Sequence, residues 1–125
     1  MEITLYKCSI CGKMVEVVKD TPAPLVCCGK PMEELIPGTS EGATEKHVPI
    51  VEVNETNVTV KVGEVEHPML EEHYIEWIAI CTKNGIYTKS LKPGDKPVAT
   101  FTINASDPFE AAYGYCNLHG FWKSK

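Results

Sequence analysis

Four cysteines near the start of the chain constrain its fold more than any other feature. Cys8 and Cys11 form a C-x-x-C pair, Cys27 and Cys28 are adjacent, and a glycine follows each pair. In an extended strand, neighbouring side chains point to opposite faces, so adjacent cysteines can bind one ion only where the chain turns sharply. The spacing therefore predicts a four-thiolate site, fitted to zinc or to a single iron, whose sulfur–metal–sulfur angle departs from tetrahedral.

The segment that carries these cysteines is too short to fold unaided. Residues 1–36 fall below the roughly 40 residues at which a domain buries enough surface to be stable alone. The stretch "PGTSEGATE", residues 37–45, is rich in Pro, Gly, Ser and Thr and is typical of a linker. We therefore predict a small domain over 1–36, a linker over 37–45 and a second domain over 46–125, with a metal or a partner chain holding the first.

Net charge, hydropathy and cysteine usage disfavour several classes of protein. The formal net charge is −5, which disfavours broad binding to nucleic acid or anionic lipid. The start of the chain lacks a secretory signal pattern, and no stretch approaches the ~18 apolar residues needed to cross a bilayer. We expect a soluble, cytoplasmic protein whose cysteines are metal ligands or inert thiols rather than disulfides.

The second domain has a β pattern. Val58, Val60 and Val62 alternate with polar residues in "NVTVKVGEV", and "HYIEWIAICTK", "KNGIYTKSL" and "VATFTINA" follow with turn signals between them. The Asn84-Gly85 pair indicates a hairpin. Helical periodicity is weak and is confined to "SDPFEAAYGY". The pattern predicts a mainly β fold, an immunoglobulin-like sandwich without the paired inter-sheet cysteines of antibody domains.

The histidines gather in this second domain. They are His47, His67, His73 and His119, and Cys116 lies three residues before the last of them. A single histidine is most often a surface or core residue, but four imidazoles and one thiolate would supply five ligands, one short of an octahedron. Zinc usually stops at four ligands, whereas imidazole and thiolate also suit iron. Such a site would keep one position open.

Five short motifs, in order along the chain, resemble those of desulfoferrodoxin, the two-iron form of superoxide reductase, and the likeness covers nearly the whole chain. They are "EKHVP" with Glu45, Lys46 and His47, "HPM" with His67, "HYIEW" with His73, "YCNLHG" with Cys116 and His119, and the cysteine pairs described above. The sequence differs at Phe121, where close relatives would be expected to have a histidine that is not a ligand.

The resemblance implies two iron ions per chain. Cys8, Cys11, Cys27 and Cys28 would hold a ferric ion in a distorted FeS4 site of a desulforedoxin-like or rubredoxin-like domain. In the immunoglobulin-like catalytic domain, a square-pyramidal ferrous centre would have an axial cysteine and four equatorial histidines, namely Cys116, His47, His67, His73 and His119.

The resemblance also implies a function: one-electron reduction of superoxide to hydrogen peroxide at the open sixth site of the ferrous centre. Lys46 would attract the anion, and Glu45 would occupy the vacant position in the ferric resting state. Electrons would come from rubredoxin or a similar small donor, the FeS4 iron being a candidate relay, and the protein would be a homodimer.

Two other functions fit the same folds. A zinc-ribbon module could be joined to an immunoglobulin-like binding domain without redox activity, or both irons could serve a pure electron carrier. Metal analysis separates the first from an iron enzyme, and the spectral response to azide separates the second. Cys81 matches no ligand motif and is predicted to be a buried structural thiol.

Overall fold

The chain divides into two compact units. The computed structural model describes residues 1–39 and 42–125. Residues 2–36 form the first unit, and residues 37–125 together with Met1 form the second. Ser40 and Glu41, in the segment predicted to be a linker, lie outside the described residues.

The first unit is built from five very short strands. They are β1 (Leu5–Lys7), β2 (Met14–Glu16), β3 (Val26–Cys27), β4 (Lys30–Pro31) and β5 (Glu33–Glu34). Antiparallel pairing gives one sheet of order β2-β1-β5 and a separate hairpin of β3 and β4. Within residues 2–36, the buried apolar side chains are Ile3, Leu5, Cys8 and Met32. So small a core cannot stabilise a domain without a cross-link.

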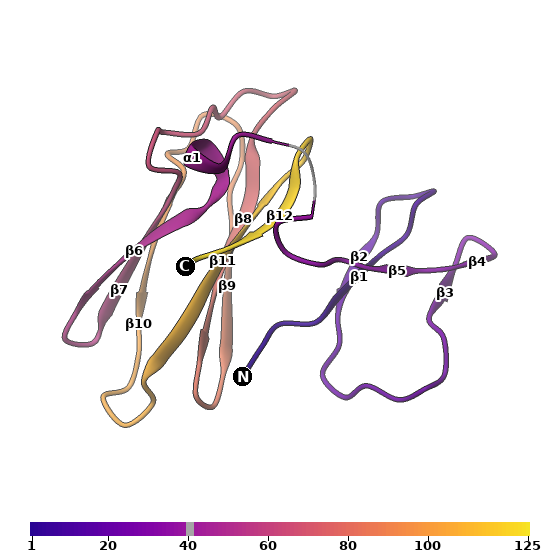
Figure 1. Ribbon diagram of the computed structural model, residues 1–125, viewed down its shortest axis with the longest axis horizontal. Coiled ribbons are helices and arrows are strands. Elements are labelled where there is room, and N and C mark those ends of the chain that lie inside the picture. Colours follow the sequence, from indigo (N-terminus) through magenta and orange to yellow (C-terminus); the bar gives the residue numbers. More distant parts are fainter. Residues whose placement is uncertain (40–41) are drawn as a thin grey trace. The chain divides into compact units, whose positions relative to one another are not determined.

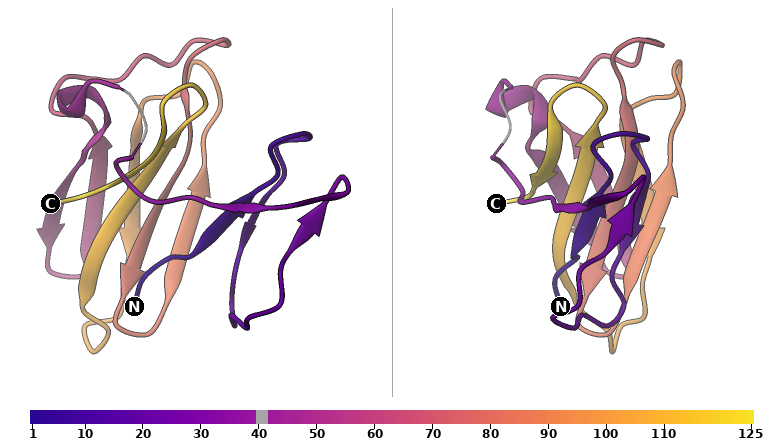
Figure 2. Two further views of the ribbon diagram at one scale, coloured as in Figure 1. Left: turned by 45° about the vertical axis from the view of Figure 1, so that its right-hand side comes forward. Right: turned by 90° about the vertical axis from the view of Figure 1, so that its right-hand side faces the viewer.

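The second unit is a sandwich of two antiparallel sheets. Its elements are α1 (Thr44–His47), β6 (Pro49–Asn54), β7 (Asn57–Val62), β8 (Ile75–Thr82), β9 (Ile86–Ser90), β10 (Val98–Thr102), β11 (Phe109–Cys116) and β12 (Gly120–Lys123). The sheets have the orders β10-β7-β6 and β12-β11-β8-β9 and face each other, as Figures 1 and 2 show. Three and four antiparallel strands are typical of immunoglobulin-like domains, so the predicted mainly β fold is confirmed.

The core of this unit lies between the sheets. Val58, Val60 and Val62 of β7 are each 0% exposed and pack with Ile78 and Ile80 of β8 in one cluster. This is the face that the sequence alternation predicted. Full burial of each valine or isoleucine contributes about 1.5–3 kcal/mol to folding, so this unit has a core of its own. The predicted burial of Cys81 is also confirmed, because its side chain is 0% exposed.

One indication from the sequence was wrong. The weak helical periodicity of residues 106–115 falls mostly on β11, which pairs with β8 on one edge and with β12 on the other. Ala111 and Ala112 favour a helix locally, but both are buried in the sheet together with Tyr113. Pairing along both edges and burial outweigh the local preference, which is a weak one.

Three connections meet at one end of the sandwich, at the top of Figure 1. They are α1, the loop from β7 to β8, and the turn from β11 to β12. Their arrangement brings together segments far apart in the sequence. Among the described residues, no helix is long or apolar enough to cross a bilayer.

Candidate metal centres

The first centre begins at the turn after β1. The N–H of Cys8 donates to the carbonyl of Lys13 at 2.9 Å, and the N–H of Gly12 donates to the carbonyl of Cys8 at 3.0 Å. The N–H groups of Cys11 and Ile10 lie 3.5 and 3.4 Å from the sulfur of Cys8 and donate to it. These two donors, that of Cys11 first, lower the pKa of Cys8 to about 6. The turn therefore favours the thiolate that a metal binds.

The adjacent cysteines sit at a two-residue hairpin turn. Cys27 ends β3 and pairs with Lys30 of β4, so that only Cys28 and Gly29 lie between the strands. Both turn residues have positive φ, +53° at Cys28 and +73° at Gly29. Positive φ at both central residues is the signature of a type I′ turn. The chain reverses within two residues, and the sulfurs of Cys27 and Cys28 lie 4.0 Å apart.

The spacing of the sulfurs fits one four-coordinate ion. All four lie within 4.8 Å of one another, with Cys11 and Cys27 at 3.6 Å. Metal–sulfur bonds of about 2.3 Å put the sulfurs of a tetrahedron roughly 3.8 Å apart. Hydrogen bonds to the sulfurs of Cys11 and Cys8 raise the pKa of Cys27 to about 12. A cation among the four sulfurs would favour their thiolate forms.

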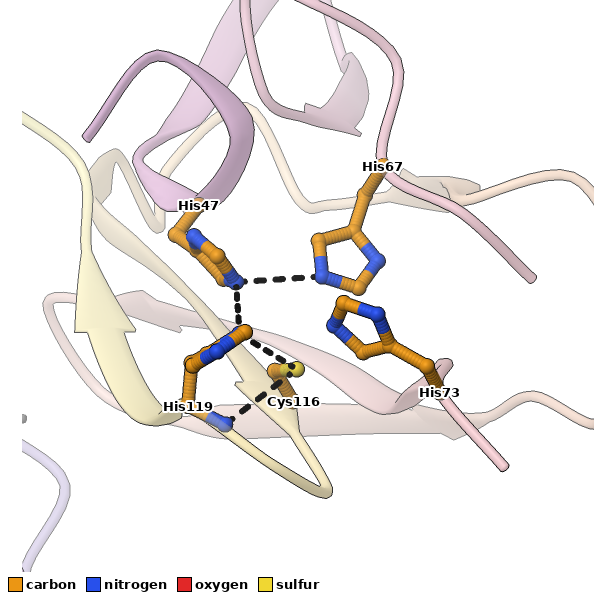
Figure 3. Close-up of side chains that lie close together, drawn as sticks. All are labelled: His47, His67, His73, Cys116 and His119. Atoms are coloured by element: carbon orange, nitrogen blue, oxygen red, sulfur yellow. Dashed lines mark hydrogen bonds between the residues drawn. The ribbon is translucent and has the colours of Figure 1, made fainter. Parts of the chain in front are cut away.

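The second centre is assembled from all three connections at the end of the sandwich. Figure 3 shows the side chains of His47 from α1, His67 and His73 from the loop between β7 and β8, Cys116 from the end of β11, and His119 from the turn that follows. One ligand atom from each lies within 4.8 Å of all the others. The structure thus brings all five predicted ligands together.

The four imidazoles form a closed square. Neighbouring ring centroids are 4.7 Å apart for His47 and His67, 4.7 Å for His67 and His73, 5.0 Å for His73 and His119, and 4.8 Å for His119 and His47. Each neighbouring pair meets nearly edge to face, at 72° to 81°. Nε2 of His47 is 3.1 Å from Nε2 of His67 and 3.1 Å from Nδ1 of His119. Four nitrogens converging in this way suit an ion with a square of equatorial ligands.

Local hydrogen bonds and burial prepare the nitrogens for a cation. Nδ1 of His47 donates to the carbonyl of Ala43, and Nδ1 of His67 donates to that of Pro68, each at 2.7 Å. Their Nε2 atoms are left to face the centre. Burial lowers the pKa of His67 to about 4 and lowers that of His47, so both rings are neutral at neutral pH. Nε2 of His73 is buried without a hydrogen-bond partner, and a metal ion at the centre would satisfy it.

The sulfur of Cys116 is the fifth donor. It lies 3.9 Å from Nδ1 of His119 and accepts a hydrogen bond from the His119 backbone N–H at 3.4 Å. Burial raises the pKa of the Cys116 thiol, and the N–H groups of His119 and Leu118 act in the opposite direction. In the part of the chain that the structure describes, no sixth histidine, cysteine or carboxylate belongs to this group.

Glu45 and Lys46 lie beside the second centre, on α1 next to His47. The N–H of Val65 donates to the Glu45 carbonyl at 2.8 Å, which ties α1 to the loop that carries His67. Lys46 lines a shallow groove with His67. After burial and the other imidazoles, the charge of Lys46 is a further cause of the lowered pKa of His47 and His73. The Glu45 carboxylate is not among the gathered ligand atoms.

Two residues at the site were missed by sequence reasoning. The Trp122 ring stacks on that of His47, with centroids 5.0 Å apart, and its Nε1–H donates to the His119 carbonyl at 2.9 Å. The Asn117 side chain bonds to the backbone on both sides of His73. Asparagine and tryptophan are common in turns and cores, and His47, Glu72 and Tyr74 lie more than 40 residues from them in the sequence, so no sequence pattern marks these contacts.

Comparisons with known proteins cover both units. A family model described as Desulfoferrodoxin matches residues 39–125, and one described as Desulfoferrodoxin, N-terminal domain, matches residues 1–35. The desulfoferrodoxin of Nitratidesulfovibrio vulgaris is 50% identical over 121 residues, which are 97% of this chain and 94% of the relative.

Solved structures agree with these matches. The superoxide reductase from Treponema pallidum aligns with a TM-score of 0.84 and 36% identity, over 100% of both chains. A superoxide reductase from Giardia intestinalis, described as 1Fe-SOR, aligns with a TM-score of 0.57 and 33% identity, over 64% of this chain and 95% of its own.

Proposed function

The chain belongs to the desulfoferrodoxin family, and from this premise we infer that it is a superoxide reductase with two iron ions per chain. Cys8, Cys11, Cys27 and Cys28 hold one iron, and the second is held by His47, His67, His73, His119 and Cys116. The observation that carries the assignment is the square of four imidazoles completed by one sulfur. Zinc does not ordinarily take five such ligands.

An iron ion held by the four histidines and Cys116 would supply one electron to superoxide, which with two protons becomes hydrogen peroxide. The protein's own residues set the conditions for this step. The buried, neutral imidazoles of His47 and His67 offer their nitrogens without competing protons. The backbone N–H of His119 stabilises the negative charge on the Cys116 sulfur. With five donors, a six-coordinate ion held here would keep one position free for a small anion.

Lys46 is proposed to draw the anion in. The protein is acidic overall, with a formal net charge of −5, so a local positive charge is needed at the site. Support comes from the position of Lys46 beside His47 and in the groove with His67. Lys46→Ala should slow the reaction of the reduced protein with superoxide about tenfold at low ionic strength. Lys46→Arg should retain most of the rate, and Lys89→Ala on β9 serves as control; an unchanged rate in Lys46→Ala would remove Lys46 from the mechanism.

Glu45 is proposed to close the open position in the oxidised protein, as the family resemblance implies. Its place next to Lys46 on α1 supports this role. Glu45→Ala should change the visible spectrum of the oxidised second centre and leave that of the FeS4 site unchanged. A spectrum identical to that of the unmodified protein would assign the sixth ligand elsewhere.

We propose rubredoxin or a similar small redox protein as the electron donor, since each turnover consumes one electron from outside. We also propose a cytoplasmic location, because a reducing compartment suits cysteines that serve as metal ligands rather than as disulfides. The division into residues 1–36, a linker over 37–45 and a catalytic domain over 46–125 is retained as a proposal, and limited proteolysis would test it by cleavage within 37–45.

A homodimer is proposed on the basis of the first unit. Ile10, Val18, Leu25 and Val26 are exposed by 60%, 95%, 39% and 61%. Side chains of this kind stabilise a small domain when a second copy covers them. Sedimentation of the iron-loaded protein should give twice the mass of the chain, and Val18→Asp with Val26→Asp should give monomers. A monomer before substitution would refute the dimer.

The function itself is tested by stoichiometry. The protein should contain two irons per chain and be coloured, and the reduced second centre should give one hydrogen peroxide for each superoxide consumed, without oxygen. Colourless protein with zinc would favour the zinc-ribbon binding module. An iron-containing protein whose visible spectrum does not change when azide is added would favour the assignment as an electron carrier.

A further inference from the structure

The ligands of the second centre are held in two different ways. His47 and His67 are held through their rings, since each donates from Nδ1 to a carbonyl close by in its own segment. The segment of His73 is held through its backbone, by a residue more than 40 positions away. That residue is Asn117, which directly follows the ligand Cys116.

The Asn117 side chain spans His73. Its Oδ1 accepts a hydrogen bond from the N–H of Tyr74 at 2.9 Å, and its Nδ2 donates to the carbonyl of Glu72 at 3.0 Å. The backbone N–H of Asn117 adds a bond to the carbonyl of Tyr74 at 3.2 Å. The carboxamide thus offers the donor and the acceptor of a peptide group to the residues on either side of His73.

The position of Asn117 in the sheet explains the need for these bonds. Pairing between β11 and β8 ends at Cys116 and Ile75, with an irregularity in the register between Tyr115 and Cys116. Bulges of this kind re-aim side chains near functional sites and end the pairing of strands. Beyond that point one backbone bond remains, from the Asn117 N–H to the Tyr74 carbonyl, and the Asn117 side chain adds two more. It continues the connection between the two strands for the residues that carry His73.

We propose that Asn117 is a positioning residue that fixes His73 relative to Cys116. The inference rests on the assignment of the second centre as an iron site. Removing the carboxamide leaves the backbone bond from the Asn117 N–H to the Tyr74 carbonyl at 3.2 Å and two backbone bonds between Leu70 and His73 at 2.9 and 3.1 Å. The His73 segment then keeps one of its three hydrogen bonds to Asn117, so His73 is held less firmly relative to Cys116 and its nitrogen is less well placed for the iron. Partners of metal ligands typically affect metal affinity by 10- to 100-fold.

The test compares Asn117→Ala with Asn104→Ala. Asn104 is a matched control because its Oδ1 also accepts two hydrogen bonds, from the N–H of Ser106 at 3.0 Å and from its hydroxyl at 2.8 Å, in a turn that carries no ligand. Asn117→Ala should release iron from the second centre to a chelator at least tenfold faster and should shift its thiolate absorption. The FeS4 absorption, an internal reference, should not change. Asn104→Ala should change neither centre.

A second measurement needs no metal. Hydrogen exchange at the Tyr74 amide should be faster in metal-free Asn117→Ala than in metal-free unmodified protein, because the bond to Oδ1 is lost. Asn117→Asp keeps an acceptor for Tyr74 but sets a carboxylate oxygen against the Glu72 carbonyl, so its iron release should be intermediate. If Asn117→Ala does not fold, Asn117→Asp decides the question through the same iron-release assay.

The proposal is overturned if iron release and absorption in Asn117→Ala match those of Asn104→Ala. Neither readout involves superoxide. A protein that positions His73 through Asn117 but does not reduce superoxide would therefore refute the proposed function and leave this inference standing.

Discussion

The two metal sites relate to their folds in opposite ways. In residues 2–36 the strands are two or three residues long, and four side chains make up the buried apolar set. In the sandwich, strands of up to eight residues surround a core that includes Val58, Val60 and Ile80, and the metal ligands lie in connections at one end. In the first unit, metal binding stabilises the fold, whereas in the second a stable fold positions the metal ligands.

The difference shows that iron can have two physical roles in one chain: it can stabilise a small domain, or it can bind to a site that the fold has already formed. A structural metal contributes its binding free energy to folding, because the unfolded chain has no preformed site. At the second centre, the positions of His47, His73 and Cys116 are set by a sandwich that already has a core. Folding there does not depend on the free energy of metal binding, so the ligands can set the properties of the ion. The following predictions test this contrast.

Metal removal should have the largest effect. When a chelator removes both ions under reducing conditions, residues 2–36 should lose protected amides altogether, while β7, β8 and β11 should stay protected. The physical reason is that the small buried set of the first unit cannot offset the entropy of ordering the chain. Hydrogen exchange read by segment measures both units in one sample. Protected amides in metal-free residues 2–36 would contradict the contrast.

Cys116→Ser should abolish the thiolate absorption of the second centre without unfolding the sandwich. The thiolate donor is lost, but serine is close to cysteine in size, so the core cluster to which Cys116 belongs keeps its other members. Visible absorption should then show the FeS4 site alone. The free energy of unfolding of the metal-free sandwich should change by about 1 kcal/mol or less. Cys81→Ser is the matched control, since Cys81 is also 0% exposed but is not a ligand. Survival of the second absorption in Cys116→Ser would require another axial ligand.

Val60→Ala should weaken the sandwich alone. Removing two methyl groups from a fully buried site leaves a cavity, and we expect a loss of about 2 kcal/mol in the free energy of unfolding. Denaturant titration should show the shift in the sandwich transition, and the FeS4 absorption should be lost at the same denaturant concentration as before. Val53→Ala, at a position that is 52% exposed, should have little effect.

Gly29→Ala and Gly94→Ala make the smallest and most closely matched test. Both glycines have positive φ, +73° and +92°, and neither has an atom within 4 Å of an added Cβ. Each substitution should cost about 1 kcal/mol through backbone strain. Gly29→Ala should speed loss of iron from the FeS4 site, and Gly94→Ala should lower only the melting of the sandwich. Equal iron loss in both variants would mean that the turn at Cys28 does not control that site.

What could be predicted from the sequence depended on how distinctive each signal was. The alternation of Val58, Val60 and Val62 gave the buried face of β7 correctly, because a period of two has one structural meaning in a strand. Cysteines in close pairs indicated the first ligand group, and the resemblance of the histidine motifs to those of desulfoferrodoxin indicated the second. In contrast, Ala111 and Ala112 suggested a helix, because the pairing of β11 on both edges is not visible in local sequence.

The contacts around the ligands could not be predicted in the same way. Asn117 and Trp122 act on His73 and His47 through the register of β11 and β12, which the sequence does not reveal. The reversal at Cys28 was expected in outline, since adjacent cysteines require a sharp turn. The pair of positive φ angles that produces it became visible only in the structure.

The two-residue turn at Cys28 and Gly29 has a consequence for protein engineering. Because one strand-end cysteine and one loop cysteine present both sulfurs on the same side, the hairpin is a portable half-site that any antiparallel pair of strands can carry. If these few residues were grafted opposite a C-x-x-C loop, they would complete a four-thiolate metal site on an ordinary hairpin. The host scaffold would need to supply no core of its own at that place.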